Sequence, residues 1–174
     1  MTRRLPGGAI KRVDFLSGVV GLTTKDIVHR AVELKVPRIG RLRVMHPVDV
    51  LDSRIQNLHL LPEKRTASGI AQGRLAVEVA RAFVRAEISA RGERAGLNLL
   101  ERIADIADDI AAVRVFLLYG IDPLHAVPLD DFRATGALHR VRWPQIVSEV
   151  EARRERLRKL TTRTAKSVRR RQPP

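Results

Sequence analysis

Residues 46–65 read His-Pro-Val-Asp-Val-Leu-Asp-Ser-Arg-Ile-Gln-Asn-Leu-His-Leu-Leu-Pro-Glu-Lys-Arg, and we expect the rest of the chain to be organised around them. A proline near its start suits the first position of a helix, and apolar residues then recur at three- and four-residue spacing. The pattern predicts an amphipathic helix with one face against a core. The apolar stripe consists of Val48, Leu51, Ile55 and Leu58.

One charged residue of this helix falls on its apolar side. Arg54 lies three positions after Leu51 and four before Leu58, so it shares their side of the helix. A charge placed there needs a partner, because burying it unpaired costs free energy. A proline ends the helix, and Lys64 and Arg65 follow at once. We interpret Arg54 and this basic pair as candidates for binding an anion.

The composition is strongly basic. The 174 residues carry 33 Lys and Arg against 19 Asp and Glu, a net charge of +14, and residues 151–174 alone contribute +8 from ten basic and two acidic residues. Such an excess favours polyanions, because neutralising phosphates releases counterions. Arginine-rich codon usage in a GC-rich genome gives the same composition without any ligand. If the tail binds nucleic acid, its contacts are Arg163, Lys166, Arg169, Arg170 and Arg171.

Several classes of protein are disfavoured by what the sequence lacks. It contains no cysteine, which excludes a disulfide framework and a thiolate zinc site. No apolar run approaches the roughly 18 residues of a membrane span, and the N-terminus has no signal-peptide pattern. We expect no membrane association and a bacterial cytoplasmic location.

The rest of the chain predicts a mainly α fold with a small N-terminal β portion. Short strands are expected near residues 11–16 and in a hairpin over 32–44. Two long helices, 70–90 and 98–116, are expected to pack antiparallel, and a final helix from residue 144 is expected to give way near Leu160 to a disordered basic tail. The predicted segments are a β portion (1–46), a helical domain (47–143) and a helix with its tail (144–174).

Asp14 stands inside the first of these strands. Taken by itself, an acid at such a place is more often a solvent-facing residue near a strand end than part of a site. The five histidines have no metal-ligand spacing, so the residues alone predict no metal centre.

The strand 42–45, the His-Pro turn, the segment Asp-Val-Leu-Asp-Ser-Arg-Ile-Gln-Asn-Leu (49–58) and Leu-Pro-Glu-Lys-Arg (61–65) together carry a resemblance. They resemble part of certain bacterial nucleotidyltransferase-fold proteins, the minimal relatives that include abortive-infection toxins. The resemblance runs from about Val13 to about Val127. It implies the remnant of a nucleotidyltransferase-like sheet followed by an antiparallel helical domain.

The resemblance also assigns roles. In this family, carboxylates hold the divalent cations that nucleotidyl transfer requires, two from an Asp-x-Asp after a Gly-Ser turn and a third from a later strand. Asp14 would be the third carboxylate, and Arg54, Lys64 and Arg65 would contact a nucleoside triphosphate or RNA phosphate. These 174 residues contain no Gly-Ser turn followed by Asp-x-Asp. We therefore expect the C-terminal part of such a protein, inactive alone, with Mg²⁺ bound only if an N-terminal half or cognate partner completes the site.

A second interpretation stays open, that of a small basic helical protein that binds nucleic acid or a protein partner. It predicts an affinity that falls steeply with salt and depends on residues 151–174.

Overall fold

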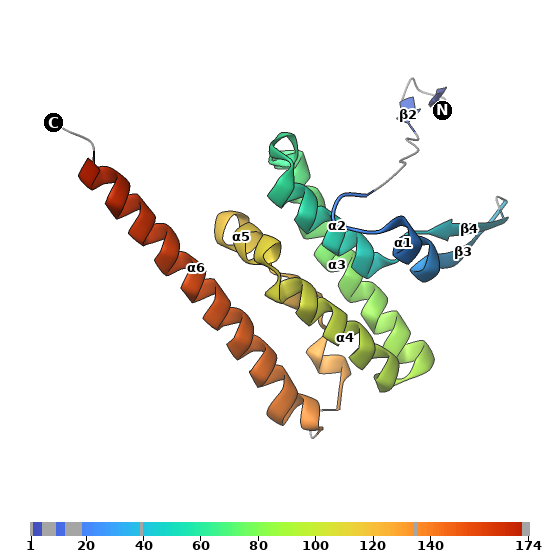
Figure 1. Ribbon diagram of the computed structural model, residues 1–174. Coiled ribbons are helices and arrows are strands. Elements are labelled where there is room, and N and C mark those ends of the chain that lie inside the picture. Colours follow the sequence, from blue (N-terminus) through green and yellow to red (C-terminus); the bar gives the residue numbers. More distant parts are fainter. Residues whose placement is uncertain (1, 5–9, 13–18, 39, 134–135, 172–174) are drawn as a thin grey trace.

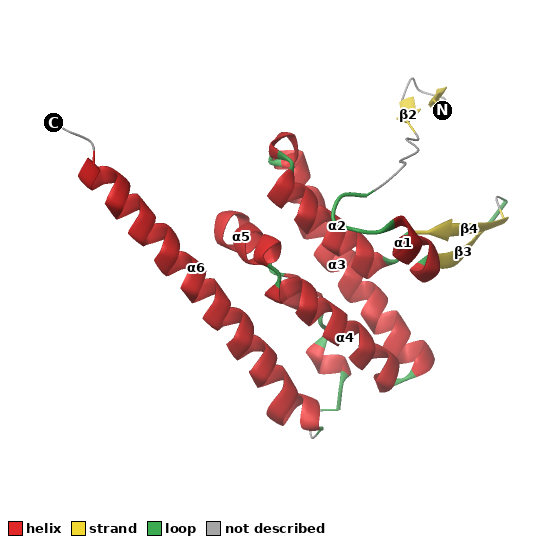
Figure 2. Ribbon diagram, viewed as in Figure 1, coloured by secondary structure: helices red, strands yellow, loops and turns green. Residues whose placement is uncertain are grey.

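The computed structural model describes residues 2–4, 10–12, 19–38, 40–133 and 136–171, of which 2–4, 10–12 and 163–171 are described as backbone only. Helices dominate, and the short strands lie in the N-terminal part (Figures 1 and 2). The predicted fold class, mainly α with a small N-terminal β portion, is confirmed. The elements are β1 (Thr2–Arg4), β2 (Ile10–Arg12), α1 (Thr24–Arg30), β3 (Val32–Val36), β4 (Gly40–Val44), α2 (Pro47–Leu60), the short helix η1 (Pro62–Lys64), α3 (Ala67–Arg91), α4 (Glu93–Asp108), α5 (Ile110–Tyr119), the short helices η2 (Pro123–Ala126), η3 (Leu129–Asp131) and η4 (Leu138–Arg142), and α6 (Trp143–Arg171).

The helix predicted from residues 46–65 is α2, and it lies at the centre of the core. His46 is its N-cap, with Nδ1 accepting a hydrogen bond from the backbone N–H of Val48 at 3.1 Å. The proline that follows occupies the first turn, where its missing N–H costs nothing. The predicted apolar stripe is buried against α3 and α5, so α2 joins the N-terminal part to the helical body.

Two long helices were expected after α2, and the structure has three helices in that part of the chain. α3 packs against α4 as predicted and also against α2, but α4 begins at Glu93 rather than at Asn98 and stops at Asp108. Asp109 then adopts an extended backbone (φ −67°, ψ 145°), and its carboxylate accepts from the N–H of Ala111 at 2.7 Å. The aspartate therefore caps a new helix, α5, which ends at the left-handed Gly120.

β3 and β4 form the predicted antiparallel hairpin. The register pairs Val32 with Val44 and Leu34 with Leu42, which puts these apolar side chains on one face, since alternate residues of a strand face the same way. The opposite face carries charged side chains, those of Glu33, Lys35, Arg41 and Arg43. β1 and β2 form a separate antiparallel pair.

α6 is longer than the sequence indicated. It runs from Trp143 to Arg171, past Leu160, where we expected order to stop. Arginine, lysine and alanine are good helix formers, and no glycine or proline interrupts the segment, so the helix can continue without an apolar stripe. Figure 1 shows its C-terminal half extending beyond α5, away from the rest of the helical body. Its first residue, Trp143, is half-buried against the core.

None of the described helices is by itself long and apolar enough to cross a membrane, although α5 and the segment Pro123–Asp131, which meet at 96°, would pass that test together as a bent pair.

Candidate functional site

A cavity of about 290 Å³ opens beside α2, and we call it the α2 cavity. Its walls come from α2, from η1 and from the turn that precedes α1. Most of the lining is apolar, with an arginine, a lysine, a hydroxyl and an amide among it. The lining residues are Val19, Val20, Met45, Val50, Ser53, Arg54, Asn57, Leu61 and Lys64.

The α2 cavity brings together two of the three residues predicted to bind an anion. Arg54 lies half-buried on α2, and Lys64 ends η1. No carboxylate lines this cavity, and among the described residues neither cation has an ion pair or a side-chain hydrogen bond. The sequence predicted that Arg54 would need a partner, and the described part of the chain does not supply one. This arrangement leaves two cations available to an anion from solution.

Two close backbone approaches fix the walls of the α2 cavity. A Cβ on Gly21, whose φ is 80°, would lie 2.6 Å from Cγ of Gln56, so only glycine lets the preceding turn lie against α2. A Cβ on Gly69 would lie 1.9 Å from the carbonyl oxygen of Lys64. The first turn of α3 therefore holds η1, and with it Lys64, in place.

The third predicted residue, Arg65, binds backbone carbonyls at the C-terminal end of α2. Its Nε donates to the carbonyl of Leu58 at 3.0 Å, and its Nη2 donates to the carbonyl of His59 at 2.6 Å. Carbonyls at a helix C-terminus have no partner within the helix, and a cation there is also favoured by the helix dipole. Arg65 thus completes the end of α2, and we do not assign it to the anion site.

The remaining predicted site residues are not placed by the structure. Asp14 lies outside the described residues, so its assignment as a metal ligand stays a prediction. Arg163, Lys166, Arg169, Arg170 and Arg171 lie on the last turns of α6, where only the backbone is described. Among the described side chains, no three His, Cys, Asp or Glu residues come together in a group that would suit a metal ion.

A buried carboxylate that sequence reasoning missed connects three helices. Asp49 of α2 is 2 % exposed and accepts from Nε of Arg30 at 3.0 and 3.1 Å and from Nη2 of Arg102 at 2.6 Å. These arginines come from α1 and α4. One carboxylate therefore faces two guanidinium groups, and the more exposed carboxylate of Asp26 lies 3.8 Å from Arg30 as a second partner.

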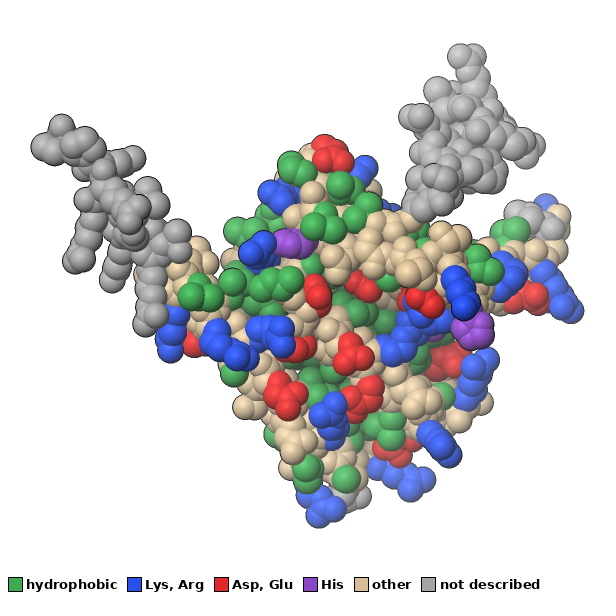
Figure 3. Space-filling model, in the orientation of Figure 1, with side chains coloured by type: hydrophobic (Ala, Val, Ile, Leu, Met, Phe, Trp, Pro, Cys, Tyr) green, Lys and Arg blue, Asp and Glu red, His purple; other side chains and the backbone are tan. Residues whose placement is uncertain are grey.

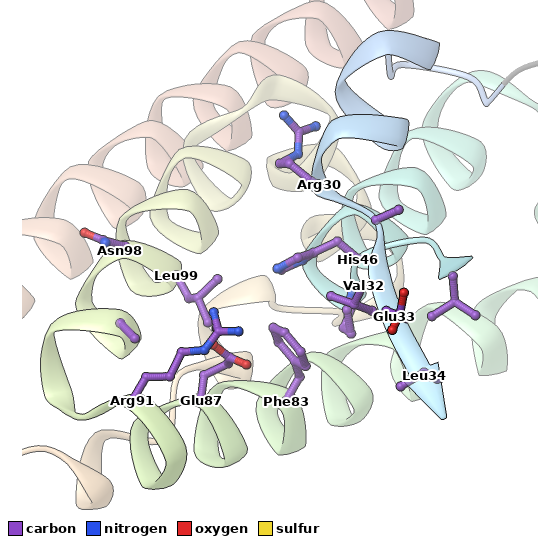
Figure 4. A pocket seen from close by; sticks show the side chains of 14 residues that line it. Arg30, Val32, Glu33, Leu34, His46, Phe83, Glu87, Arg91, Asn98 and Leu99 are labelled. Atoms are coloured by element: carbon purple, nitrogen blue, oxygen red, sulfur yellow. Dashed lines mark ion pairs between the residues drawn. The ribbon is translucent and has the colours of Figure 1, made fainter. Parts of the chain in front are cut away.

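A larger cavity, about 750 Å³, lies between the β3–β4 hairpin and the helices α3 and α4, and we call it the hairpin cavity (Figure 4). The His46 ring points into it, and Phe83 meets that ring edge-on with centroids 4.8 Å apart. Glu87 and Arg91, whose charged atoms are 3.2 Å apart, lie along the α3 wall. Burial, and then the neighbouring Arg102 guanidinium, lower the pKa of His46 to about 4.

Charges on the body of the molecule are mixed rather than separated. On the face in Figure 3, acidic and basic side chains alternate over the central helices. Many of them form pairs, such as Arg142 with Glu101 and Arg153 with Asp108. The positive excess therefore does not form one basic surface on this face.

Comparison with known proteins gives no relative: no family model, no curated protein and no solved structure matches this chain.

Proposed function

We propose that this protein binds the phosphate groups of a nucleotide or RNA in the α2 cavity, as the helical part of a nucleotidyltransferase-like protein of the bacterial cytoplasm. The observation that supports this most directly is that Arg54 and Lys64 line the same cavity and that no carboxylate lines it. Ser53 and Asn57 add a hydroxyl and an amide that can donate hydrogen bonds to phosphate oxygens.

The size of the α2 cavity limits what it can hold. At about 290 Å³ it stands at the lower end of the roughly 300–1,000 Å³ typical of small-molecule sites. It suits one or two phosphate groups better than an entire nucleoside triphosphate. The sugar and base of a nucleotide, or the rest of an RNA strand, would then extend outside this cavity.

Catalysis is not part of what we propose for the chain alone. Transfer would need Mg²⁺ and several converging carboxylates, and Asp14 is the one acid that the resemblance assigns to that task. The described side chains provide no set of carboxylates for the metal. We propose that activity, if it exists, requires an N-terminal half or a cognate partner protein that supplies the other acids.

The C-terminal part of α6 supports a second candidate function, nonspecific binding of nucleic acid. Residues 163–171 continue the helix and contain five basic residues and no acid. Such a helical segment can contact successive phosphates without reading a sequence.

The two candidates are separated by measuring the affinity of the full chain for pyrophosphate, ATP and a single-stranded RNA. We expect Arg54→Gln and Lys64→Gln each to weaken pyrophosphate and ATP binding about tenfold, since each removes a charge-assisted hydrogen bond. Arg140→Gln, which removes an exposed charge from η4, is the matched control and should change nothing. Unchanged pyrophosphate affinity in both site variants would overturn the α2 assignment, and RNA binding that depends only on residues 163–174 would favour the second function.

Label transfer from each ribonucleoside triphosphate to RNA or protein, with Mg²⁺ or Mn²⁺, tests catalysis directly. We expect no transfer by the wild-type chain or by Asp14→Ala. Transfer that requires Asp14 would mean that the chain holds a complete site.

A further inference from the structure

The turn of the β3–β4 hairpin carries an arginine in a backbone conformation that suits glycine. Pro37 precedes Arg38, whose φ is 66°, and among the described residues Arg38 alone has a positive φ without being glycine. A proline followed by a positive φ is typical of a type II turn, in which glycine or asparagine is preferred at the second central position. A left-handed backbone at an arginine costs stability, so the turn itself gives no reason for this residue.

A second unfavourable feature lies beside the turn. The register places Lys35 directly opposite Arg41, and like charges at opposed positions destabilise a pair of strands. Arg41 reaches Glu33 at 3.2 Å, whereas neither Lys35 nor Arg38 has an ion pair or a side-chain hydrogen bond among the described residues. All three basic residues are exposed. Neither feature stabilises the hairpin, and sequences break such local rules mainly at functional sites.

The hairpin has an excess of positive charge that its surroundings do not offset. Residues 32–44 contain four basic residues and one acid. The adjoining cluster of Arg30 and Arg102 with Asp26 and Asp49 is neutral in sum. The excess on the hairpin therefore favours a polyanion.

The face of the hairpin that carries these charges is open to solvent. Val32, Leu34 and Val44 line the hairpin cavity, so the apolar face lies toward the helices, and the charged residues Lys35 and Arg41 belong to the opposite face. Figure 1 shows the hairpin reaching outward from the helical body. A large ligand can therefore approach the charged face without meeting the helices.

The chemistry of the charged face favours duplex DNA among polyanions. A protein interface has an apolar core, and single-stranded nucleic acid is bound by stacking its bases on aromatic side chains. The charged face has no apolar side chain, and residues 32–44 include no aromatic residue. A two-stranded ribbon fits the major groove of B-DNA, about 12 Å wide, whereas the major groove of A-form RNA is too deep and narrow for side chains to read.

We propose that the charged face of the β3–β4 hairpin binds duplex DNA at its major groove, with Lys35, Arg38 and Arg41 contacting phosphates. Such contacts position a protein on DNA and carry no sequence information by themselves. This surface is separate from the α2 cavity, and it does not depend on the proposed phosphate binding there.

Fluorescence anisotropy of the full chain with a short DNA duplex, the matching RNA duplex and the matching single-stranded DNA tests the proposal. Arg38→Gly should weaken binding of the DNA duplex about tenfold at about 0.1 M salt, because each phosphate contact contributes about 0.9 to the slope of log affinity against log salt. The same substitution should keep or raise the melting temperature, because glycine adopts a positive φ without steric cost.

Lys35→Glu is the second variant, and it places an acid opposite Arg41. It should raise the melting temperature, since opposite charges at opposed positions stabilise a pair of strands, and weaken binding of the DNA duplex at least tenfold. Arg94→Gln, which removes an exposed charge from α4, is the matched control and should change neither quantity.

Three results would overturn the proposal. The first is an affinity for the DNA duplex in both hairpin variants equal to that of Arg94→Gln. The second is an equal loss of affinity for the DNA duplex, the RNA duplex and the single strand, which would exclude the major groove of DNA as the ligand. The third is a lower melting temperature in both hairpin variants, which would show that Lys35 and Arg38 serve the fold.

Discussion

Among single residues, His46 and Asp49 should matter most for the stability of the fold, because both are buried polar groups at the start of α2. His46 caps the helix, and Asp49 holds Arg30 and Arg102. Losing one partner of such a group leaves the other desolvated and unpaired, which costs more than an exposed pair would.

His46 should make the stability of the fold depend on pH. Its pKa is about 4 in the folded protein and 6.5 when exposed, so the unfolded chain binds more protons between these values. Stability is therefore lost as the pH falls from about 6.5 toward 4. Between pH 7 and pH 5 we expect the wild type to lose about 2 kcal/mol more than His46→Asn in urea unfolding followed by Trp143 fluorescence. Parallel pH profiles for the two proteins would contradict this.

Asp49→Asn should destabilise the protein by about 2 kcal/mol, below the usual cost for a fully buried pair, because both arginines keep about a third of their side chains exposed. Urea unfolding measures the change. Asp26→Asn, which removes the longer, exposed contact to Arg30, serves as the control and should destabilise the protein clearly less than Asp49→Asn does.

The local role of α2 residues was predictable, and their distant partners were not. Apolar spacing correctly gave the buried stripe of α2. The same spacing put Arg54 on that side of the helix, whereas the structure places it on a cavity wall with Ser53 and Asn57. Asp49 escaped notice because an acid in the first helical turn is ordinarily explained by the helix dipole. Its partners stand 19 and 53 residues away, and no local pattern encodes that convergence.

At the level of elements, α6 is anchored by one buried arginine. Arg154 is 2 % exposed, pairs with Asp122 and Glu151 at 2.7 Å, and lies 3.6 Å above the ring of Phe116. Asp122 in turn caps η2 by accepting from the N–H of Leu124. The contact therefore fastens α6 to the end of α5 and to the turn that follows it.

Arg154→Ala should destabilise the fold by about 3 kcal/mol, since it leaves Asp122 buried without its cation. The neighbouring Arg153→Ala breaks a more exposed pair with Asp108 and should cost less than about 1 kcal/mol. Thermal unfolding of both variants gives the comparison. Similar losses in the two would show that burial of Arg154 is not what secures α6.

The elements also mark where sequence patterns stop being informative. The hairpin and the existence of α3 followed from alternation and helical spacing. The break between α4 and α5 did not, because an apolar stripe runs across it and an aspartate fits a helix surface as well as a cap. The extension of α6 was missed because its apolar stripe ends near Leu160. Residues with good intrinsic helix propensity continue beyond that point, and the helix continues with them.

For the whole molecule, the end of α6 differs in its charge pattern from the face shown in Figure 3. On that face acidic and basic side chains are intermixed over the central helices, while residues 163–171 carry five positive charges without an acid. Arg154 also sets where the chain can be shortened safely. A deletion from residue 151 removes this anchor, whereas one from residue 163 does not.

Deleting residues 163–174 should therefore leave the fold intact and reduce the salt dependence of RNA binding. If all five cations contact phosphates of a single strand, the slope of log affinity against log salt should fall in magnitude by about 3.5. Titrations at several salt concentrations measure it, and Arg54→Gln should lower this slope by less than about 1. An unchanged slope after the deletion would exclude the tail as a phosphate-binding segment.

The contact between Gly69 and the Lys64 carbonyl has a consequence for how variation is tolerated. Any side chain at position 69 would push η1 away from α3 and so move the lysine relative to Arg54. In a saturation library selected for phosphate binding, position 69 should then accept as few residues as position 54 does. Position 69, which touches no ligand, would then be as strongly constrained as position 54, which does. The set of positions that tolerate few substitutions would therefore include residues that do not line the cavity.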